Sequence, residues 1–226
     1  LSTGNFIYDR TDLEVVGREP FVFRRFYNAI NGREGVLGRD WNHNYEVHLE
    51  FMDGEAVLLR EDGKEERFFW EKDRYLSLFA SEGVLEKAED GYTYRTREQK
   101  VYRFDREGMC LETETLLGSL VTFTYEEGSP FRLVKAEKDT GEFFSFSYDA
   151  EGKLEHVKDH TGRSLSYKYQ GSLLKEVTLP DGNTFRYGYT PQGKLEHVEN
   201  PRGIVTVENF FDEEHRTTLQ KFPDGT

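Results

Sequence analysis

Between residues 143 and 203 the hydrophobic and polar positions of the chain follow one short pattern three times. Each copy holds two aromatic residues two apart, a turn that ends in Gly, a Leu-x-x-Val run and a second turn with Gly. Two landmarks recur independently about every 21 residues, namely Tyr125, Tyr148, Tyr169 and Tyr189, and the glycines Gly141, Gly162, Gly182, Gly203 and Gly225. Two landmarks with one period indicate an internal repeat.

The turn residues predict what each copy builds. In the turn 149–152 an Asp comes first and a Gly fourth, as type I turns prefer, and in 190–193 a Pro fixes φ at the second position. The Asp-Gly pair at 181–182 predicts a tight hairpin turn. Two turns per copy leave two strands of roughly 6 to 8 residues, within the normal range. The repeating unit is therefore predicted to be a β-hairpin.

The two faces of the strands follow from the two-residue period of extended backbone. One face is predicted to carry a ladder of aromatic rings, from Phe144, Phe146, Tyr148, Tyr167, Tyr169, Phe185, Tyr187 and Tyr189. The other face is polar. A single hairpin cannot bury such a ring face, so successive copies should pair edge to edge into one sheet, with burial completed by further copies. We expect the rings to pack between neighbouring strands, and stacking on sugars is the alternative.

The chain outside the repeats shows two further regions. In residues 1–44, strands are predicted at 5–9, 12–16 and 20–27, followed by a Gly-rich loop from Asn28 to Gly38. Residues 45–110 alternate strands with Gly-containing turns, and the sheet is expected to continue through them into repeats over 111–226. The last four residues, Pro-Asp-Gly-Thr, open another hairpin, so we expect the chain to be a piece of something longer.

The repeats resemble the Rhs/YD-repeat family, whose unit carries Tyr-Asp, a Gly-containing turn and a Leu-x-x-Val run. The best copy is 148–154, Tyr-Asp-Ala-Glu-Gly-Lys-Leu. Other copies lack the Asp after the Tyr, and the copy at 211–215 lacks the Gly, which argues against a chemical role for the Asp. The residues assigned to the repeat motif are Tyr125, Gly128, Tyr148, Asp149, Gly152, Tyr169, Tyr189 and Gly193.

The first 44 residues are similar to a domain that often precedes Rhs repeats. That domain begins Thr-Gly-Asn-Phe and continues with Asp-Leu, Arg-x-Tyr-Asn and Leu-Gly-x-x-Trp. The matching residues here are Thr3, Gly4, Asp12, Leu13, Arg25, Tyr27, Asn28, Leu37, Gly38 and Trp41. The resemblance identifies residues 1–44 as an Rhs-associated N-terminal segment.

In the family the sheet spirals into a hollow shell that encloses a C-terminal passenger, often a toxin used against neighbouring bacteria. The resemblance therefore implies an all-β fold of antiparallel hairpins in one long curved sheet, as a non-enzymatic segment of such a shell. Its partners would be the remaining repeats and the passenger of the same polypeptide, together with secretion or delivery machinery. The location would be secreted, at the cell surface or on a bacterial secretion system. Any catalysis would lie beyond Thr226.

Composition and charge narrow the classes of function. Thirty basic and 43 acidic residues leave a net charge of −13, which argues against nucleic-acid binding because that binding depends on neutralising phosphates. The single cysteine, Cys110, cannot form an internal disulfide and is expected to be a buried filler. No apolar run approaches the 18 residues of a membrane span. The competing hypothesis is a cell-surface glycan-binding module that uses the ring ladder.

Candidate chemistry is sparse. The six histidines are not spaced as a metal-ligand set, and the adjacent carboxylates at 65–66, 126–127 and 213–214 should point to opposite faces of a strand. No nucleophile elbow and no phosphate loop occurs in the sequence. We therefore expect no catalytic residue, no metal and no cofactor, and a hydrolase built on clustered carboxylates is the weakest hypothesis.

Overall fold

The computed structural model describes residues 5–77, 83–128, 132–214 and 216–222, which form strands and turns without a helix. Thr3 and Gly4 of the N-terminal motif and Gly225 of the repeat lie outside the described residues. Within these ranges no helical segment has the length and hydropathy that crossing a bilayer requires.

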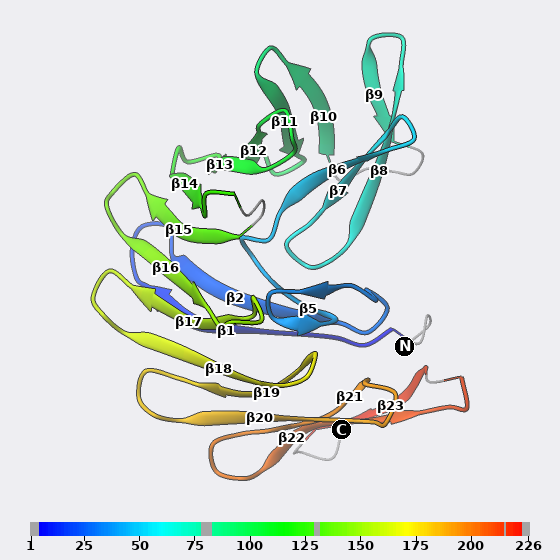
Figure 1. The fold of residues 1–226 in the computed structure, drawn as a ribbon, viewed down its shortest axis with the longest axis vertical. Coiled ribbons are helices and arrows are strands. Elements are labelled where there is room, and N and C mark those ends of the chain that lie inside the picture. The colour runs from blue at the N-terminus through cyan, green and yellow to red at the C-terminus, as the bar shows by residue number, and fades with distance from the viewer. Residues whose placement is uncertain (1–4, 78–82, 129–131, 215, 223–226) are drawn as a thin grey trace.

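The strands form three sheets and one short ribbon (Figure 1). The first sheet joins β1 (Ile7–Val15), β2 (Phe21–Asn28) and β5 (Trp41–His43), and the ribbon is β3 (Glu34–Gly35) with β4 (Gly38–Arg39). The second sheet holds β6 (His48–Met52), β7 (Glu55–Leu59), β8 (Glu65–Glu71) and β9 (Arg74–Ser77).

The third sheet is long and contains 14 strands in chain order. They are β10 (Gly83–Ala88), β11 (Gly91–Thr96), β12 (Val101–Phe104), β13 (Cys110–Glu114), β14 (Leu120–Tyr125), β15 (Leu133–Lys138), β16 (Phe143–Tyr148), β17 (Leu154–Asp159), β18 (Ser164–Gln170), β19 (Leu173–Thr178), β20 (Thr184–Tyr189), β21 (Leu195–Glu199), β22 (Val205–Phe211) and β23 (Thr217–Lys221). Figure 1 shows this sheet curving from β10 at the top to β23 at the bottom. The predicted all-β fold of hairpins paired in sequence is confirmed.

The repeat turns share one hydrogen-bond pattern. In the turn 149–152, Gly152 N donates to Asp149 O at 3.0 Å, Asp149 N donates to Lys153 O at 2.9 Å, and Gly152 has a φ of 81°. The turn before Asn183 has the same pattern and includes Pro180, so the Asp-Gly pair at 181–182 does not make a tighter turn of its own. Proline fixes the second turn position there, which selects the longer loop with Gly in the left-handed region.

Replacing Gly152 by Val should destabilise the protein by about 1 kcal/mol or more, because a branched side chain disfavours positive φ. Gly188→Ala should cost less. Gly188 lies mid-strand, outside the left-handed region, and the new Cβ would lie 2.0 Å from the ring of His197, a 39% exposed side chain that can rotate away. Thermal melts that gave the reverse order would mean that this assignment of strand and turn is wrong.

Two predictions for the N-terminal segment, residues 1–44, need correction. The strands predicted at 5–9 and 12–16 are one strand, β1, whose register against β2 shifts between Thr11 and Leu13. A β-bulge at Asp12 therefore takes the place of the predicted break. The predicted loop 28–38 contains β3 and ends at Gly38, the first residue of β4. Part of the loop therefore forms a small two-stranded ribbon.

Within the described residues the strands of 45–110 lie in two sheets, and the predicted join between them falls on residues 78–82, which lie outside the described residues. Strands β6 to β9 form a sheet of their own, and the long sheet begins at β10. The two sheets bury apolar side chains against each other, with Leu49, Leu58 and Phe68 on one side and Leu85 and Tyr94 on the other. Packing face to face buries these residues, which edge-to-edge pairing would leave on an open face.

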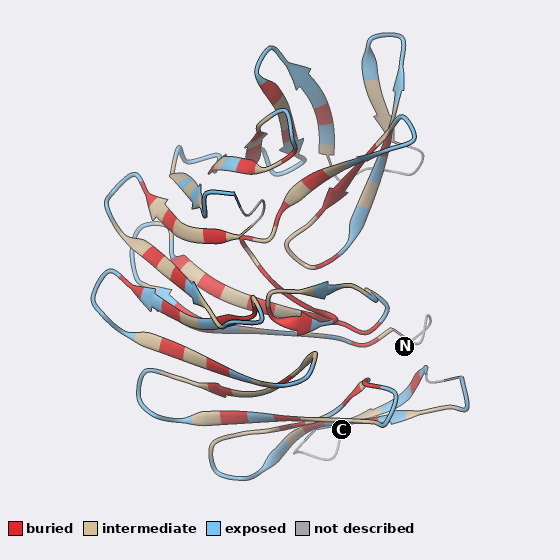
Figure 2. Cartoon of the chain, in the orientation of Figure 1, coloured by how far each residue is buried: buried red, intermediate tan, exposed pale blue. Residues whose placement is uncertain are grey.

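The ring ladder of the repeats lies on one face of the sheet, as predicted, and this face is covered by the N-terminal segment. Figure 2 shows buried residues concentrated in the inner strands, where β1, β2 and β5 lie against the long sheet. Phe144 is 0% exposed and Tyr187 is 3% exposed. The expectation that burial needs further repeats is therefore wrong for this part of the sheet, because the chain supplies its own second layer.

Candidate functional site: the seam between the N-terminal segment and the repeats

The seam, meaning the contact of the N-terminal segment with the ring face of β14 to β22, is built from aromatic pairs. Phe21 stacks on Phe144 with ring centres 4.5 Å apart, and His43 stacks on Phe146 at 5.7 Å. Trp41 meets Tyr187 edge to face at 5.1 Å. Aromatic pairs in such geometries add specific stabilisation to their burial. The rings of the ladder therefore pack against rings of the N-terminal segment.

A buried ion pair lies at the centre of the seam. The side chains of Arg25 and Asp12 are both 0% exposed, and Arg25 Nη2 donates to Asp12 Oδ1 at 3.0 Å and to the Tyr187 hydroxyl at 2.9 Å. The guanidinium lies 5.0 Å from the Trp41 ring centre and 5.8 Å from that of Tyr167. Burial lowers the pKa of Arg25, but the Asp12 carboxylate more than offsets this, so the pKa is raised and Arg25 stays charged.

The bulge of β1 explains this geometry. A bulge inserts an extra residue and re-aims a side chain, and here the register shift falls next to Asp12. Asp12 belongs to the predicted Asp-Leu motif, and Leu13 beside it is 3% exposed in the same core. The Asp-Leu motif thus supplies a buried carboxylate and, at the next position, a side chain of the hydrophobic core.

The repeat tyrosines form a ladder of hydroxyl hydrogen bonds. Each hydroxyl donates to the carbonyl 15 residues earlier, from Tyr125 to Cys110 at 2.8 Å, Tyr148 to Leu133 at 2.6 Å, Tyr169 to Leu154 at 2.7 Å and Tyr189 to Leu174 at 2.7 Å. The backbone pairing of β15 with β16 ends at Lys135 and Ser145, so the hydroxyl of Tyr148 reaches a carbonyl beyond that ladder. Each tyrosine hydroxyl therefore links two neighbouring strands at the end where their backbone hydrogen bonds have stopped.

In the following copy an asparagine performs this role. Asn209 Nδ2 donates to Leu195 O at 2.9 Å, whereas Phe211, which the sequence aligns with the tyrosines, has no hydroxyl to donate. From the sequence the tyrosines were predicted only as packing rings, so this hydrogen-bonding function was not predicted. A signal was present, because the residue 15 positions before each tyrosine is apolar, namely Cys110, Leu133, Leu154 and Leu174.

The other repeat-motif residues are structural. Asp149 Oδ1 accepts the backbone N–H groups of Glu151 and Lys153, each at 2.9 Å, so this carboxylate organises its turn. Gly128, Gly152 and Gly193 have positive φ, as their turns require.

The N-terminal motif residues dock on the repeats. Trp41 Nε1 donates to the Tyr189 hydroxyl at 3.0 Å, and the Tyr27 hydroxyl accepts from Leu195 N at 3.0 Å. Leu37 is 0% exposed. Asn28 Oδ1 accepts from Asn5 within the segment itself.

Glycine at position 38 permits the closest approach in the seam. The neighbouring Arg39 N donates to Ser172 O at 2.8 Å, and a Cβ on Gly38 would lie 2.4 Å from that same carbonyl oxygen. Gly38 also has a φ of 90°. The Leu-Gly pair of the motif therefore fits a backbone contact that any larger residue would obstruct.

Basic residues at the hairpin ends form ion pairs and hydrogen bonds with the edges of the N-terminal segment. Lys153 Nζ lies 2.6 Å from Glu34 Oε1, and Lys194 Nζ lies 3.5 Å from the buried Asp40 carboxylate. At the opposite ends, Lys138 and Arg163 donate to the backbone carbonyls of residues 19 and 14 at 2.9 and 2.8 Å. These four residues carry no local sequence signal, because their partners are more than 100 positions away.

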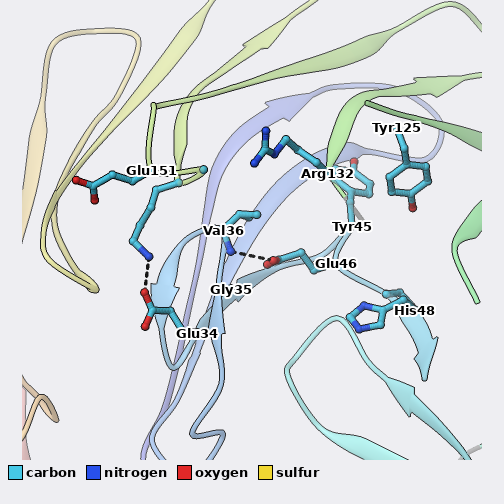
Figure 3. A pocket seen from close by; sticks show the side chains of 12 residues that line it. Glu34, Gly35, Val36, Tyr45, Glu46, His48, Tyr125, Arg132 and Glu151 are labelled. Carbon is cyan, nitrogen blue, oxygen red and sulfur yellow. Dashed lines mark hydrogen bonds and ion pairs between the residues drawn. The ribbon is translucent and has the colours of Figure 1, made fainter. Parts of the chain in front are cut away.

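A cavity of about 500 Å³ opens at one end of the seam (Figure 3). It is lined by the ribbon at 34–36, by the linker 45–48 and by residues of the repeats including Tyr125 and Arg132. The Glu46 carboxylate accepts from His43 N at 2.8 Å and from Val36 N at 3.4 Å, and burial raises its pKa to about 7. The bases around the cavity are paired within the protein, as with Arg132 and Glu126 at 2.8 Å.

The remaining candidate groups are the single cysteine and the possible metal ligands. Cys110 is buried, and burial raises the pKa of its thiol. Among the described residues, no group of three or more His, Cys, Asp or Glu is arranged to hold a metal ion. The expectation that the chain needs no metal or cofactor stays a prediction.

Comparison with known proteins decides the family. A domain of unknown function, DUF6531, matches residues 1–68, and the teneurin YD-shell matches residues 130–218. The probable deoxyribonuclease RhsB of Dickeya dadantii is 25% identical over 189 residues, which cover 80% of this chain and 12% of that protein. The chain belongs to the Rhs/YD-repeat family.

Two bacillus proteins are also similar to this Rhs/YD-repeat chain. The tRNA3(Ser)-specific nuclease WapA of Bacillus spizizenii is 26% identical over 225 residues, covering 77% of the chain and 10% of that protein. The tRNA nuclease WapA of Bacillus subtilis (strain 168) is 27% identical over 113 residues, covering 49% and 5%. The chain thus spans about a tenth or less of most such relatives, and it represents a segment of an Rhs-type shell.

Replacing Tyr169 by Phe in this Rhs/YD-repeat chain should lower the free energy of unfolding by about 1 to 3 kcal/mol. The change keeps the ring and removes the hydroxyl, which leaves the carbonyl of Leu154 without that donor. Urea unfolding measures the effect. Tyr8→Phe is the control, since Tyr8 packs on the same core and its hydroxyl makes no hydrogen bond to the described residues. Equal losses in the two variants would contradict the ladder.

Two buried groups of the seam, His43 and Glu46, should change the stability of the protein in opposite directions as the pH falls. Burial lowers the pKa of His43 from 6.5 to about 3, so the unfolded state binds a proton that the folded state does not, and stability is lost as pH falls below about 6.5. Burial raises the pKa of Glu46 from 4.5 to about 7, so the folded state binds the extra proton, and stability is gained as pH falls from about 7.

Between pH 7.5 and 5 the two effects oppose each other, and single variants should separate them. His43→Phe should gain stability relative to wild type on acidification, and Glu46→Gln should lose it. Urea unfolding at both pH values measures the change. Identical pH profiles for wild type and both variants would show that neither group titrates as its burial implies.

Proposed function

We propose that this chain is a non-enzymatic part of an Rhs-type shell that encloses a C-terminal toxin or effector passenger of the same polypeptide. The N-terminal segment would close or brace the inner face at the start of the wall. The observation that supports this most is the covered ring face, where Arg25, Asp12 and Trp41 fix a second layer onto the curved sheet.

The relatives supply the passenger class. Those named above are called nucleases, and this chain aligns with about a tenth or less of most of them. A nuclease activity would then belong to the rest of such a polypeptide. The net charge of −13 fits this division, because an acidic wall has little affinity for the nucleic acid that a nuclease must reach.

A shell of this type would be secreted, displayed at the cell surface or carried by a bacterial secretion system. Its partners would be the remaining repeats, the passenger and the delivery machinery. The basic residues that bind the N-terminal segment support its permanent attachment to the repeats. Several separate ion pairs and hydrogen bonds to carbonyl groups would have to break together for the segment to detach.

Deletion of residues 1–226 from a complete polypeptide that carries this chain tests the proposal. We expect the C-terminal region to become sensitive to limited proteolysis while it keeps its intrinsic activity. Trp70→Phe in the same polypeptide is the control, because Trp70 is 44% exposed and lies outside the seam. Identical proteolysis patterns with and without the segment would show that it does not contribute to an enclosure.

A further inference from the structure

A second hollow lies away from the seam, between the four-stranded sheet and the long sheet. It is a groove of about 950 Å³ between β9 and β10, whose walls include Trp70 and Tyr75 on one side and Val84 and Lys87 on the other. Figure 1 shows the hairpins that hold these strands diverging toward the top of the view. The shell function proposed above does not use this groove.

Aromatic rings line the groove and remain open to solvent. Trp70 is 44% exposed, whereas Trp41 in the seam is 1% exposed. Trp70 meets Tyr75 edge to face at 4.9 Å, and Tyr75 meets Tyr92 at 6.1 Å. Grooves that combine exposed rings with a few polar groups are typical binding sites for small ligands.

The charges around the rings restrict the ligand. Asp73 and Arg74 lie on the β9 side of the groove, and Glu86, Lys87 and Glu89 lie on the β10 side, which gives one more acidic than basic residue. Together with the net charge of −13, this disfavours an anionic ligand. A neutral ligand that both donates and accepts hydrogen bonds matches the mixture of carboxylates with a guanidinium and an ammonium group.

We propose that this groove binds a neutral oligosaccharide. The apolar C–H face of a sugar ring would stack on Trp70 or Tyr75, and its hydroxyls would reach the carboxylates and Lys87, whose Nζ lies 5.7 Å from the Trp70 ring centre. The site differs from the ring ladder of the repeats, whose faces are covered by the N-terminal segment. The inference does not depend on the passenger.

The chain offers a direct optical test, because its two tryptophans lie in different environments. Titration with cellohexaose, chitohexaose and maltohexaose should change the emission of the exposed Trp70 for at least one of them. Trp70→Phe should abolish the signal, and calorimetry on that variant should show weaker binding. Tyr75→Ala should raise the Kd roughly tenfold.

Phe222→Ala is the matched control, since Phe222 is a 45% exposed ring outside the groove, and its Kd should equal that of wild type. Thermal melts establish that each variant is folded. No response to any of the three sugars at millimolar concentration would overturn the proposal. Unchanged calorimetric binding in Trp70→Phe, or binding of a heparin hexasaccharide or an extended peptide in place of the neutral sugars, would also overturn it.

Discussion

Replacing Asp12 by Ala should lower the free energy of unfolding by about 3 to 5 kcal/mol. The change leaves the Arg25 guanidinium, which is fully buried in the seam, without its carboxylate partner. The remaining contacts to Tyr187 and Trp41 are neutral and do not balance the charge. Urea unfolding followed by circular dichroism measures the loss.

The same pair of strands provides a control for this prediction. Asp9 and Arg24 form an ion pair between β1 and β2, but their side chains are 41% and 43% exposed. Asp9→Ala should therefore cost less than about 1 kcal/mol. The double variant Asp12→Leu with Arg25→Met should recover much of the loss, because it removes both buried charges. Similar losses for Asp12→Ala and Asp9→Ala would contradict the assignment of a buried pair.

Trp41→Ala should also destabilise the chain strongly, by about 3 to 5 kcal/mol. The side chain is 1% exposed, packs against Tyr27 and Tyr187, and donates to the Tyr189 hydroxyl, so its removal leaves a cavity at the seam. Thermal and urea unfolding measure the effect.

The second tryptophan is the matched control for this change. Trp70→Ala should cost within about 1 kcal/mol, since nearly half of that side chain already contacts solvent. If the two tryptophan variants lost stability equally, Trp41 would not be the anchor that joins β5 to the repeats.

The hairpins were predictable because their signals are local. A period of two sets which side chains share a face, so Phe144, Phe146 and Tyr167 could be assigned to one face from sequence alone. Turn glycines such as Gly152 mark positions where positive φ is required. These signals depend on residues close together in the sequence, and they recur in each repeat.

The second layer was not predictable in this way. Arg25 meets Tyr187 across 162 positions of sequence, and Lys153 meets Glu34 across 119. No local pattern records such contacts. For the same reason the sequence could not show that β6 to β9 pack face to face with the long sheet, because strands of one pattern fit either edge pairing or face-to-face packing.

The resemblance identified the right residues without their roles. Asp12, Arg25 and Trp41 were named as motif positions, and the structure places them together in the seam. Their types carried a hint, since an Asp and an Arg within apolar strands are rarely buried unless paired. The tyrosine hydroxyl ladder has a signal in the sequence, because an apolar residue, Leu in three of the four copies, stands 15 positions before each tyrosine.

Native-state hydrogen exchange tests the central claim most directly, namely that the N-terminal segment and the repeats form one cooperative unit. We expect amides in β1 and β2 to open with the same free energy as those in β16 to β20, and Asp12→Ala to lower both opening free energies equally. If β1 and β2 exchanged at a much lower free energy than the repeats, and Asp12→Ala left the repeats unchanged, the segment would be a loose attachment and the seam would not close the inner face.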